Sequence, residues 1–298
     1  MRILIAGSSG LIGSELVPFL RDEGHTVHRL VRRYTKLSDD ERSWDPEHKK
    51  LDPQILESYD AIINLAGTNI ADSRWNDSIK KEILKSRVES TRLLTEVLTQ
   101  LPKPPKVFIS ASAIGFYGDR GEDPATETTP SGKGFLAKVC REWEHAAEAA
   151  AKAGIRVVTP RIGVVLAAQG GAFKKMLMPF KLGVGGVIGT GNQYMSWVTL
   201  DDLLRIFHLI LNDDNIKGPL NAVTSFPVTN REFTKTLGNV LNRPTLFTLP
   251  AFAVRMAFGE MADEMLLSGV KAVPVKLQKA GYTFLYPQLE PALKHLIS

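Results

Sequence analysis

The chain has almost no cysteine, since Cys140 is the only one among 298 residues. A single thiol excludes an internal disulfide and a cysteine-rich metal site, and we predict no metal centre. Long apolar runs are also missing, because the run that follows Arg2 ends at Gly7. That run is too short for a signal peptide or a membrane span. We therefore expect a cytoplasmic protein that has no membrane partner.

The chain also lacks a block of like charges. It has 37 basic and 32 acidic side chains, and the net charge of +5 is spread along the sequence. Such a mild bias does not indicate nucleic-acid binding, and an anionic phosphate ligand would suit it equally well. The 44% of hydrophobic and 23% of charged residues are ordinary for a globular protein. The composition leaves the oligomeric state open.

What the chain does contain is a regular alternation of short apolar runs with helical patterns. The runs predict buried strands, and the stretches between them carry apolar residues at helical spacing. This alternation is typical of an α/β protein with a Rossmann-type, doubly wound parallel sheet, which binds its ligand at the carboxyl ends of the strands. The predicted strands are 2–6, 26–31, 61–65, 107–110 and 155–158, and the predicted helices 11–21, 76–101 and 134–153.

The texture of the sequence changes after residue 168. Residues 169–193 are rich in glycine, and short helical patterns then alternate with loops marked by proline. We predict a dinucleotide-binding domain over residues 1–168, to which residues 196–223 return. Residues 169–195 and 224–298 would form a smaller, mostly helical substrate lobe. No repeats are visible.

The first strand and first helix are joined by a glycine loop, Gly7-Ser8-Ser9-Gly10-Leu11-Ile12-Gly13. In a dinucleotide-binding loop the first glycine permits the tight turn, and the second lets the backbone approach the diphosphate. The third lets the helix pack against the strand, while the helix N-terminus supplies N–H donors. The alternative is a glycine-rich turn that serves packing only. Because the loop directly follows a buried strand, we favour the cofactor.

The end of the second strand indicates which dinucleotide is bound. A carboxylate there would hold the ribose of NAD, whereas an arginine accommodates the extra phosphate of NADP. This chain has Arg32 and Arg33 at that point and no carboxylate until Asp39. We predict NADP (NADPH), with Arg32 on the 2′-phosphate and Arg33 in support. Otherwise the two arginines are solvated charges at a strand end.

The G-x-x-G-x-x-G spacing resembles the short-chain dehydrogenase/reductase superfamily, in particular its extended, epimerase-like branch. The resemblance implies that Leu65, Ala66 and Gly67 contact the adenosine half of the cofactor. It also implies that the helix containing VESTRLL passes beneath the cofactor, where Arg87 replaces the usual asparagine and points inward, with Glu82 as a second candidate. A surface helix with scattered charges is the alternative. The segment PRIGVVL would place Ile162 beside the nicotinamide, and Gln193 and Trp197 would face the substrate, although Trp197 would serve equally well as a packing residue.

In this superfamily a serine holds the substrate oxygen, and a tyrosine and a lysine four residues apart on one helix transfer the proton. The resemblance assigns Ser112 as the serine and Lys138 as the lysine, but Gly134 stands where the tyrosine is expected. Tyr117, in the nearby FYG turn, is the candidate replacement. Tyr117 could instead be a packing aromatic, and Lys138 a solvated helix residue.

The motifs GSSGLIG, NLAGTNI, REWE and MLMPFKLGVGG together resemble an atypical subfamily of nucleoside-diphosphate sugar epimerase-like proteins. Some members carry the label "cell division inhibitor", and human relatives are described as NADP-binding oxidoreductases. The resemblance implies an NADP-dependent oxidoreductase or epimerase that acts on a small molecule, such as a nucleotide sugar. Because the tyrosine is missing, a non-catalytic NADP(H)-binding regulator is the alternative. Only the label supports a third possibility, an interaction protein of cell division.

Overall fold

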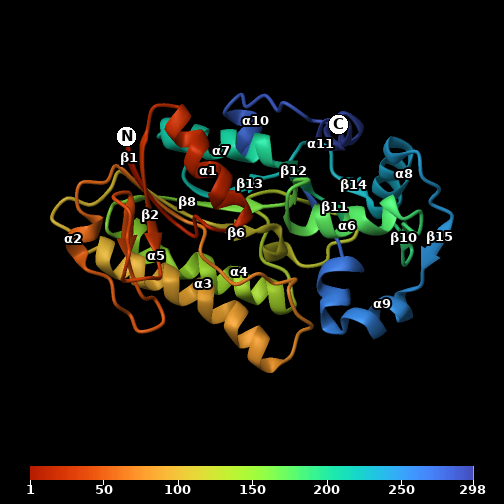
Figure 1. The fold of residues 1–298 in the computed structure, drawn as a ribbon, viewed down its shortest axis with the longest axis horizontal. Helices are drawn as coiled ribbons and strands as arrows, with labels where there is room; N and C mark the ends of the chain where they lie inside the picture. Colours follow the sequence, from red (N-terminus) through yellow and green to blue (C-terminus); the bar gives the residue numbers. More distant parts are fainter. Residues whose placement is uncertain (298) are drawn as a thin grey trace.

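The computed structural model of the protein describes residues 1–297 (Figure 1). Its centre is a parallel sheet in the order β13-β8-β5-β4-β1-β2-β3, with β6 paired to β8. The strands of this sheet are β1 (Arg2–Ala6), β2 (Thr26–Val31), β3 (Glu41–Ser43), β4 (Ala61–Asn64), β5 (Val107–Ser110), β6 (Ser112–Ala113), β8 (Arg156–Ile162) and β13 (Gly218–Ala222).

Helices cover both faces of the sheet because successive side chains of its strands alternate between the faces. Ile3 and Ile5 of β1 point to the layer of α1 and α7, whereas Leu4 and Ala6 point to the layer that includes α3 and α5. Figure 1 shows the two layers on opposite sides of the sheet. The helices are α1 (Leu11–Asp22), α2 (Pro53–Leu56), α3 (Asp77–Leu98), α4 (Phe135–Ala146), α5 (Glu148–Lys152) and α7 (Leu200–Asn212), and a 3-10 turn, η1, spans Ile114–Tyr117. The predicted Rossmann-type, doubly wound fold is therefore confirmed.

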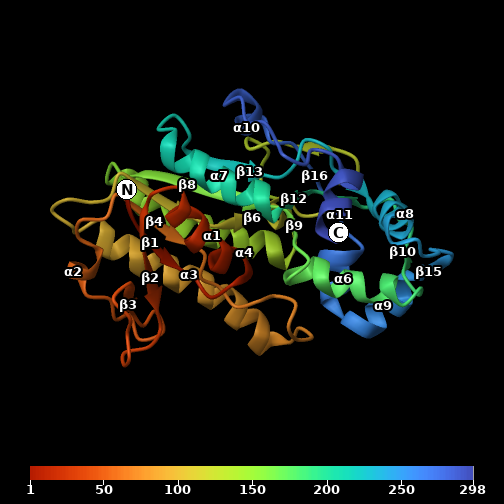
Figure 2. The same ribbon diagram turned by 45° about the horizontal axis from the view of Figure 1, so that its top comes forward.

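Most of the rest of the chain gathers beyond one end of this sheet, whereas α10 packs against β13 (Figure 2). Its helices are α6 (Gly171–Lys181), α8 (Asn230–Leu241), α9 (Ala251–Phe258), the π-helical turn η2 (Ala262–Leu266), α10 (Val275–Lys279) and α11 (Leu289–Ile297). Short strand pairs connect them: β10 (Gly186–Ile188) with β15 (Phe247–Leu249), β11 (Tyr194–Met195) with β14 (Val228–Thr229), β12 (Trp197–Thr199) with β9 (Val164–Leu166), and β16 (Lys271–Ala272) with β7 (Pro124–Ala125). We call the helices and strands in residues 169–195 and 224–297 the second lobe.

Several element boundaries differ from those expected from the sequence. The long helix expected over 134–153 is two helices, because the chain turns at Ala147 between α4 and α5. Strand β8 continues past Val158 through Pro160, where its neighbour β13 supplies the pairing residue Leu220. Neither β3 nor β13 has the apolar pattern of a buried strand, so the sequence did not predict them. Pairing with β2 and β8 orders them instead.

Candidate functional site

The glycine loop joins β1 to the N-terminus of α1, and its glycines meet different demands. Gly7 has a φ of +79°, and a Cβ there would lie 2.6 Å from the carbonyl carbon of Leu65. A Cβ on Gly13 would overlap the carbonyl oxygen of Gly7. Gly10 has an ordinary φ of −79°, and a Cβ there would lie 3.5 Å from that oxygen. The fold therefore requires glycine at positions 7 and 13, but not at position 10.

The bare Cα of Gly10 lies at the start of α1. No side chain caps this helix, and its first turn contains no acidic residue. The first N–H groups of a helix have no partner inside it and carry a partial positive charge, so they attract anions. The residues of this loop thus fit a diphosphate that approaches the backbone closely. Ser8, Ser9, Leu11 and Ile12 adjoin Gly10 in this loop, and their contacts with a cofactor stay predictions.

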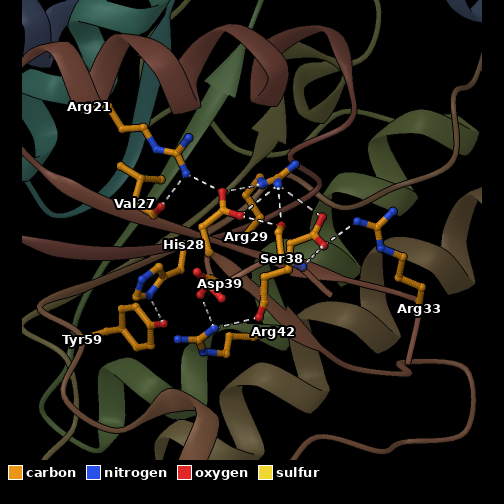
Figure 3. Close-up of polar contacts among 11 residues, drawn as sticks. Arg21, Val27, His28, Arg29, Arg33, Ser38, Asp39, Arg42 and Tyr59 are labelled. Carbon is orange, nitrogen blue, oxygen red and sulfur yellow. Dashed lines mark hydrogen bonds and ion pairs between the residues drawn. The ribbon is translucent and has the colours of Figure 1, made fainter. Parts of the chain in front are cut away.

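The two arginines after β2 have different surroundings. Arg33 bonds to the carboxylate of Glu41, which is buried at the start of β3 and also accepts the backbone N–H of Ser38 at 3.0 Å. Arg29 forms an ion pair with the same carboxylate at 3.3 Å and donates two hydrogen bonds of 3.0 Å to Asp40; Figure 3 shows these contacts. Arg32 is exposed, and its side chain has no hydrogen bond or ion pair within residues 1–297. Of the predicted pair, only Arg32 has all its donors available.

The carboxyl end of β4 is held by a buried hydrogen-bond network. Asn64 donates to the hydroxyl of Thr91 at 2.9 Å, and Trp143 donates to the same oxygen at 3.0 Å. These bonds connect β4, α3 and α4, and they position the backbone of Leu65, Ala66 and Gly67 at the edge of the sheet. The guanidinium of Arg87 lies beside Gly67, because a Cβ on Gly67 would be 3.1 Å from its Cζ.

Ser112 lies against one face of α4. Its hydroxyl donates to Glu144 at 2.7 Å, and the η1 turn that follows packs on Leu136 and Cys140. Leu136, Cys140 and Glu144 are spaced by four residues, so they share one side of the helix. Burial raises the pKa of the Cys140 thiol to about 11, which keeps it protonated at neutral pH. The side of α4 that faces Ser112 therefore carries neither a tyrosine nor a lysine.

Lys138 lies elsewhere on α4. It is two residues from both Leu136 and Cys140, a rotation of about 200°, and its side chain is exposed without a partner within residues 1–297. The structure does not bring Lys138 together with Ser112, so the placement matches the alternative of a solvated helix lysine. Its assignment as the lysine of the reaction stays an untested prediction.

Tyr117 is fully buried. Its hydroxyl donates to Asn221 at 2.6 Å and accepts from Arg161 at 2.9 Å. Burial raises the pKa of Tyr117 above its ordinary value, while Arg161 opposes part of this shift. A hydroxyl with these partners is suited to holding the turn in place, so the environment favours the packing alternative over proton transfer.

Glu144 and Arg161 lie in the segments REWE and PRIGVVL, which carry the family resemblance, but neither residue was predicted to belong to the site. The buried Arg161 binds Glu144 through two parallel bonds of 2.8 and 2.9 Å, and its guanidinium also lies 3.5 Å from the centre of the Phe116 ring. This pair connects Ser112 to Tyr117. An arginine inside a buried strand could have revealed the pair, because such a charge needs a carboxylate partner.

The remaining predicted site residues are Ile162, Glu82, Gln193 and Trp197. Ile162 is buried in the core at the end of β8. Glu82 is exposed and accepts the hydroxyl of Thr68 at 3.1 Å. Gln193 donates to the backbone oxygens of Ile188 and Leu266, and Trp197 is fully buried with its N–H on Phe226. The last two side chains therefore have structural partners, and their contacts with a substrate are untested.

The second lobe contacts the helices of the parallel sheet near the starts of α3 and α4. Glu264 of η2 accepts the backbone N–H groups of Phe135 and Leu136 at 2.9 and 3.0 Å. Lys80 of α3 binds Glu260 at 2.7 Å. Neither carboxylate was predicted from the sequence, because both lie more than a hundred residues away from their partners.

Residues 1–297 contain no group of three or more histidine, cysteine, aspartate or glutamate side chains that could hold a metal ion. No helix within this range has both the length and the apolar character needed to cross a membrane.

The parallel sheet, the glycine loop at its centre and the helices on both faces define a Rossmann-type α/β protein. A family model described as "NAD dependent epimerase/dehydratase family" matches residues 3–222, and a domain of unknown function matches residues 249–296. The chain belongs to the NAD-dependent epimerase/dehydratase family, as the resemblance to epimerase-like proteins predicted.

Two curated relatives cover almost the whole chain. An epimerase family protein of Mycobacterium tuberculosis is 43% identical over 291 residues, which are 98% of this chain and 96% of the relative. The human epimerase family protein SDR39U1 is 37% identical over an alignment of 301 positions, which covers 100% of both chains.

Solved structures of epimerase-family proteins are also similar to this chain. The crystal structure of human SDR39U1 (isoform 2) with NADPH has a TM-score of 0.88 at 35% identity and covers 99% of both chains. A nucleoside-diphosphate sugar epimerase from Corynebacterium glutamicum has a TM-score of 0.82 at 36% identity, covering 100% of this chain and 58% of that one. UDP-glucose 4-epimerase of Thermus thermophilus with NAD, at 17% identity and a TM-score of 0.74, shares the fold.

Proposed function

We propose that the protein is an NADPH-binding oxidoreductase or epimerase, which transfers hydride at a carbon that bears oxygen. The observation that carries the proposal is the pairing of a bare Cα at Gly10, which the fold does not require, with a free guanidinium at Arg32. A diphosphate fits the first and a 2′-phosphate the second. The human relative, crystallised with NADPH, supports this choice of cofactor.

The neighbouring structures support the class of substrate. They include a nucleoside-diphosphate sugar epimerase from Corynebacterium glutamicum and the UDP-glucose 4-epimerase of Thermus thermophilus. We propose that the substrate is a small molecule such as a nucleotide sugar, bound between the strand ends and the second lobe. The cytoplasmic location and the division into residues 1–168 with 196–223 and residues 169–195 with 224–298 belong to the same proposal.

NADPH, when bound, would supply the hydride, and the chain's own residues would hold the oxygen of the substrate. The hydrogen of the Ser112 hydroxyl is directed at Glu144, so the lone pairs of its oxygen can accept a hydrogen bond from the hydroxyl of the alcohol that hydride addition to a carbonyl produces. To hold the carbonyl substrate itself, the Ser112 hydroxyl would have to turn from Glu144 and donate to the carbonyl oxygen. Arg161 pairs with Glu144 and holds it in position. The presence of Arg32 supports a reductase, which exchanges its cofactor, rather than an epimerase, which retains NAD.

One observation favours a second function, a non-catalytic NADP(H)-binding regulator. The face of α4 next to Ser112 presents Leu136 and Cys140, neither of which transfers protons at neutral pH. Lys138 is on the far side of the helix, and the Tyr117 hydroxyl is buried. A protein with this site would bind the cofactor tightly and respond to its oxidation state.

A turnover assay distinguishes the two functions. Purified protein is incubated with NADPH and a panel of sugar nucleotides, aldehydes and quinones, and oxidation of NADPH is followed by absorbance. Turnover that is lost in Ser112→Ala supports the oxidoreductase. Tyr117→Phe and Lys138→Met test the other two candidates in the same assay. Tight NADPH binding without turnover on any member of the panel supports the regulator.

A further inference from the structure

The most exposed large apolar side chains of the protein lie together in the second lobe. Six of them are between 61 and 87% exposed, and no other large apolar side chain within residues 1–297 is exposed to this extent. Val184, which lies near them in the chain, follows at 60%. We call the six residues the apolar patch: Met178, Leu182, Leu246, Phe247, Phe252 and Met256.

The apolar patch comes from two segments of the chain that the fold brings side by side. Leu182 directly follows α6, and β10 begins four residues later with Gly186, which pairs with Phe247 of β15. Pro250 is the only residue between β15 and α9. Figures 1 and 2 both show α6, β10, β15 and α9 at the end of the molecule opposite α2. The six side chains therefore belong to one surface.

Helix α9 shows that the fold does not bury this surface itself. Seven of the eight residues of α9 are apolar, yet Val254 is the only one of them whose side chain is buried. Phe252 and Met256 are four residues apart, so they project from one side of the helix. A helix that is apolar all round is normally buried. A contiguous patch of exposed apolar side chains therefore indicates a binding surface.

The segments that carry the apolar patch are positively charged. Residues 169–193 and 233–259 contain six lysines and arginines but no aspartate or glutamate. These six charges exceed the net charge of +5 of the whole chain, so the charge is less evenly spread than the sequence first indicated. Two of the six cations pair with carboxylates from outside these segments.

Two other cations border the apolar patch with their charges available. Lys181 directly precedes Leu182, and Arg243 lies three residues before Leu246. Both side chains are exposed, and neither has a carboxylate partner within residues 1–297. The surface therefore combines apolar side chains with a positive rim.

This combination indicates the kind of partner. A second copy of the chain would bring the same cations against one another, and like charges across an interface cost affinity. An anionic lipid bilayer offers phosphates to the cations and an apolar interior to the side chains, and the cytoplasmic leaflet of a membrane carries such lipids. The lack of a long apolar run predicted no membrane partner, but it excludes only a membrane span and leaves contact with the lipid surface open.

We propose that the apolar patch binds the surface of an anionic lipid bilayer, with α9 lying in the plane of the headgroups. Phe252 and Met256 enter between the acyl chains, while Lys181 and Arg243 contact lipid phosphates. Such a contact is peripheral and reversible, because α9 is too short to cross the bilayer. The inference does not depend on the proposed cofactor or reaction.

Sedimentation of the full-length protein with lipid vesicles tests the apolar side chains. Vesicles of equal parts phosphatidylglycerol and phosphatidylcholine should bind the wild-type protein at least about tenfold more tightly than vesicles of phosphatidylcholine alone. Phe252→Gln combined with Met256→Gln should weaken this binding at least about tenfold. The matched control, Phe226→Gln with Leu285→Gln, changes two exposed apolar residues outside the patch and should stay within about twofold of wild type.

The same assay tests the positive rim. Lys181→Glu combined with Arg243→Glu should abolish the preference for phosphatidylglycerol, and added salt should weaken the binding of wild type. Lys103→Glu combined with Lys279→Glu makes the same change in net charge at exposed positions away from the patch. This control should keep most of the preference.

Thermal unfolding checks that the variants are folded. All should melt close to the wild-type temperature, because the changed side chains are exposed, and Met256→Gln alone provides a milder second variant. The inference would be overturned by a wild-type protein that binds neither kind of vesicle or binds both equally, or by equal losses in the patch and control variants. A wild-type dimer in analytical ultracentrifugation that Phe252→Gln with Met256→Gln dissociates would also overturn it.

Discussion

The carboxylate of Glu264 occupies the space that a side chain at Gly134 would need. A Cβ built on Gly134 would lie 2.5 Å from Oε1 of Glu264, and the φ of this glycine is +106°. The same carboxylate accepts the first two N–H groups of α4. The absence of a tyrosine at position 134 therefore has a structural cause, because a residue of the second lobe caps the helix there.

This arrangement predicts that Glu264 stabilises the fold. Glu264→Ala removes the cap of α4 and should lower the free energy of unfolding by about 1 to 2 kcal/mol. The control is Asp263→Ala, which breaks an exposed ion pair with Arg255 and should cost less than about 0.5 kcal/mol. Urea denaturation measures both. Equal stability of the two variants would contradict the capping role.

Substitutions in the glycine loop can separate effects on stability from effects on NADPH binding. Gly10→Ala adds a methyl group that the protein tolerates, so its stability should stay within about 0.5 kcal/mol of wild type. Its NADPH affinity should fall at least about tenfold, because the methyl group occupies space needed by the diphosphate. Gly13→Ala, the matched variant, should be destabilised by its overlap with Gly7. Chemical denaturation and calorimetry together test the pair, and normal NADPH affinity in Gly10→Ala would exclude the predicted approach.

Replacing Lys138 or Tyr117 should not have the effects expected of a proton-transfer pair. Lys138→Met changes an exposed side chain and should leave stability and NADPH affinity unchanged. Tyr117→Phe removes a hydroxyl from the buried partners Asn221 and Arg161 and should cost about 1 to 3 kcal/mol of stability. Thermal unfolding and calorimetry measure these effects. A loss of turnover in Lys138→Met at full stability would restore Lys138 to the site.

The loop after β2 should respond to acid. Hydrogen bonds from Arg29, assisted by Ser38 and Arg21, hold the pKa of Asp40 well below its ordinary value, and Arg33 lowers that of Glu41 to about 2. A carboxylate with a depressed pKa stabilises the fold above its unfolded pKa, and this contribution is lost as the pH falls through the folded pKa. Asp40→Asn should therefore lower the unfolding midpoint at pH 7.

The difference in midpoint between Asp40→Asn and wild type should shrink as the pH falls below about 4. Asp39→Asn is the neighbouring control, because its side chain has no partner within residues 1–297, and it should differ little from wild type at any pH. A constant difference for Asp40→Asn between pH 7 and pH 3 would show that the charge of Asp40 does not stabilise the loop.

The parts of the site that depend on local backbone were predictable from the sequence. The strand before Gly7, the helix after Gly10 and the arginines after Val31 are consecutive in the chain, so their spacing determines their geometry. The part of the site on α4 was harder to predict from the sequence. The spacing of four residues between position 134 and Lys138 does not tell which side of the helix faces Ser112. The packing of η1 on Leu136 decides that phase.

Contacts between segments that are distant in the chain also could not be predicted from the sequence. Arg33 and Arg32 are equivalent in the sequence, and only the return of the chain at β3 brings Glu41 to one of them. In the same way, Glu264 reaches α4 from 128 residues away in the chain. These pairings depend on how the second lobe and β3 fold against the sheet, which no local pattern encodes.

The central claim is that the loop of residues 7–13 and the guanidinium of Arg32 bind NADPH. Calorimetry of wild type and Arg32→Gln with NADPH and with NADH tests it most directly. We predict that wild type binds NADPH at least about tenfold more tightly than NADH and that Arg32→Gln loses this preference. No heat of binding with either nucleotide, or tighter binding of NADH by wild type, would contradict the claim.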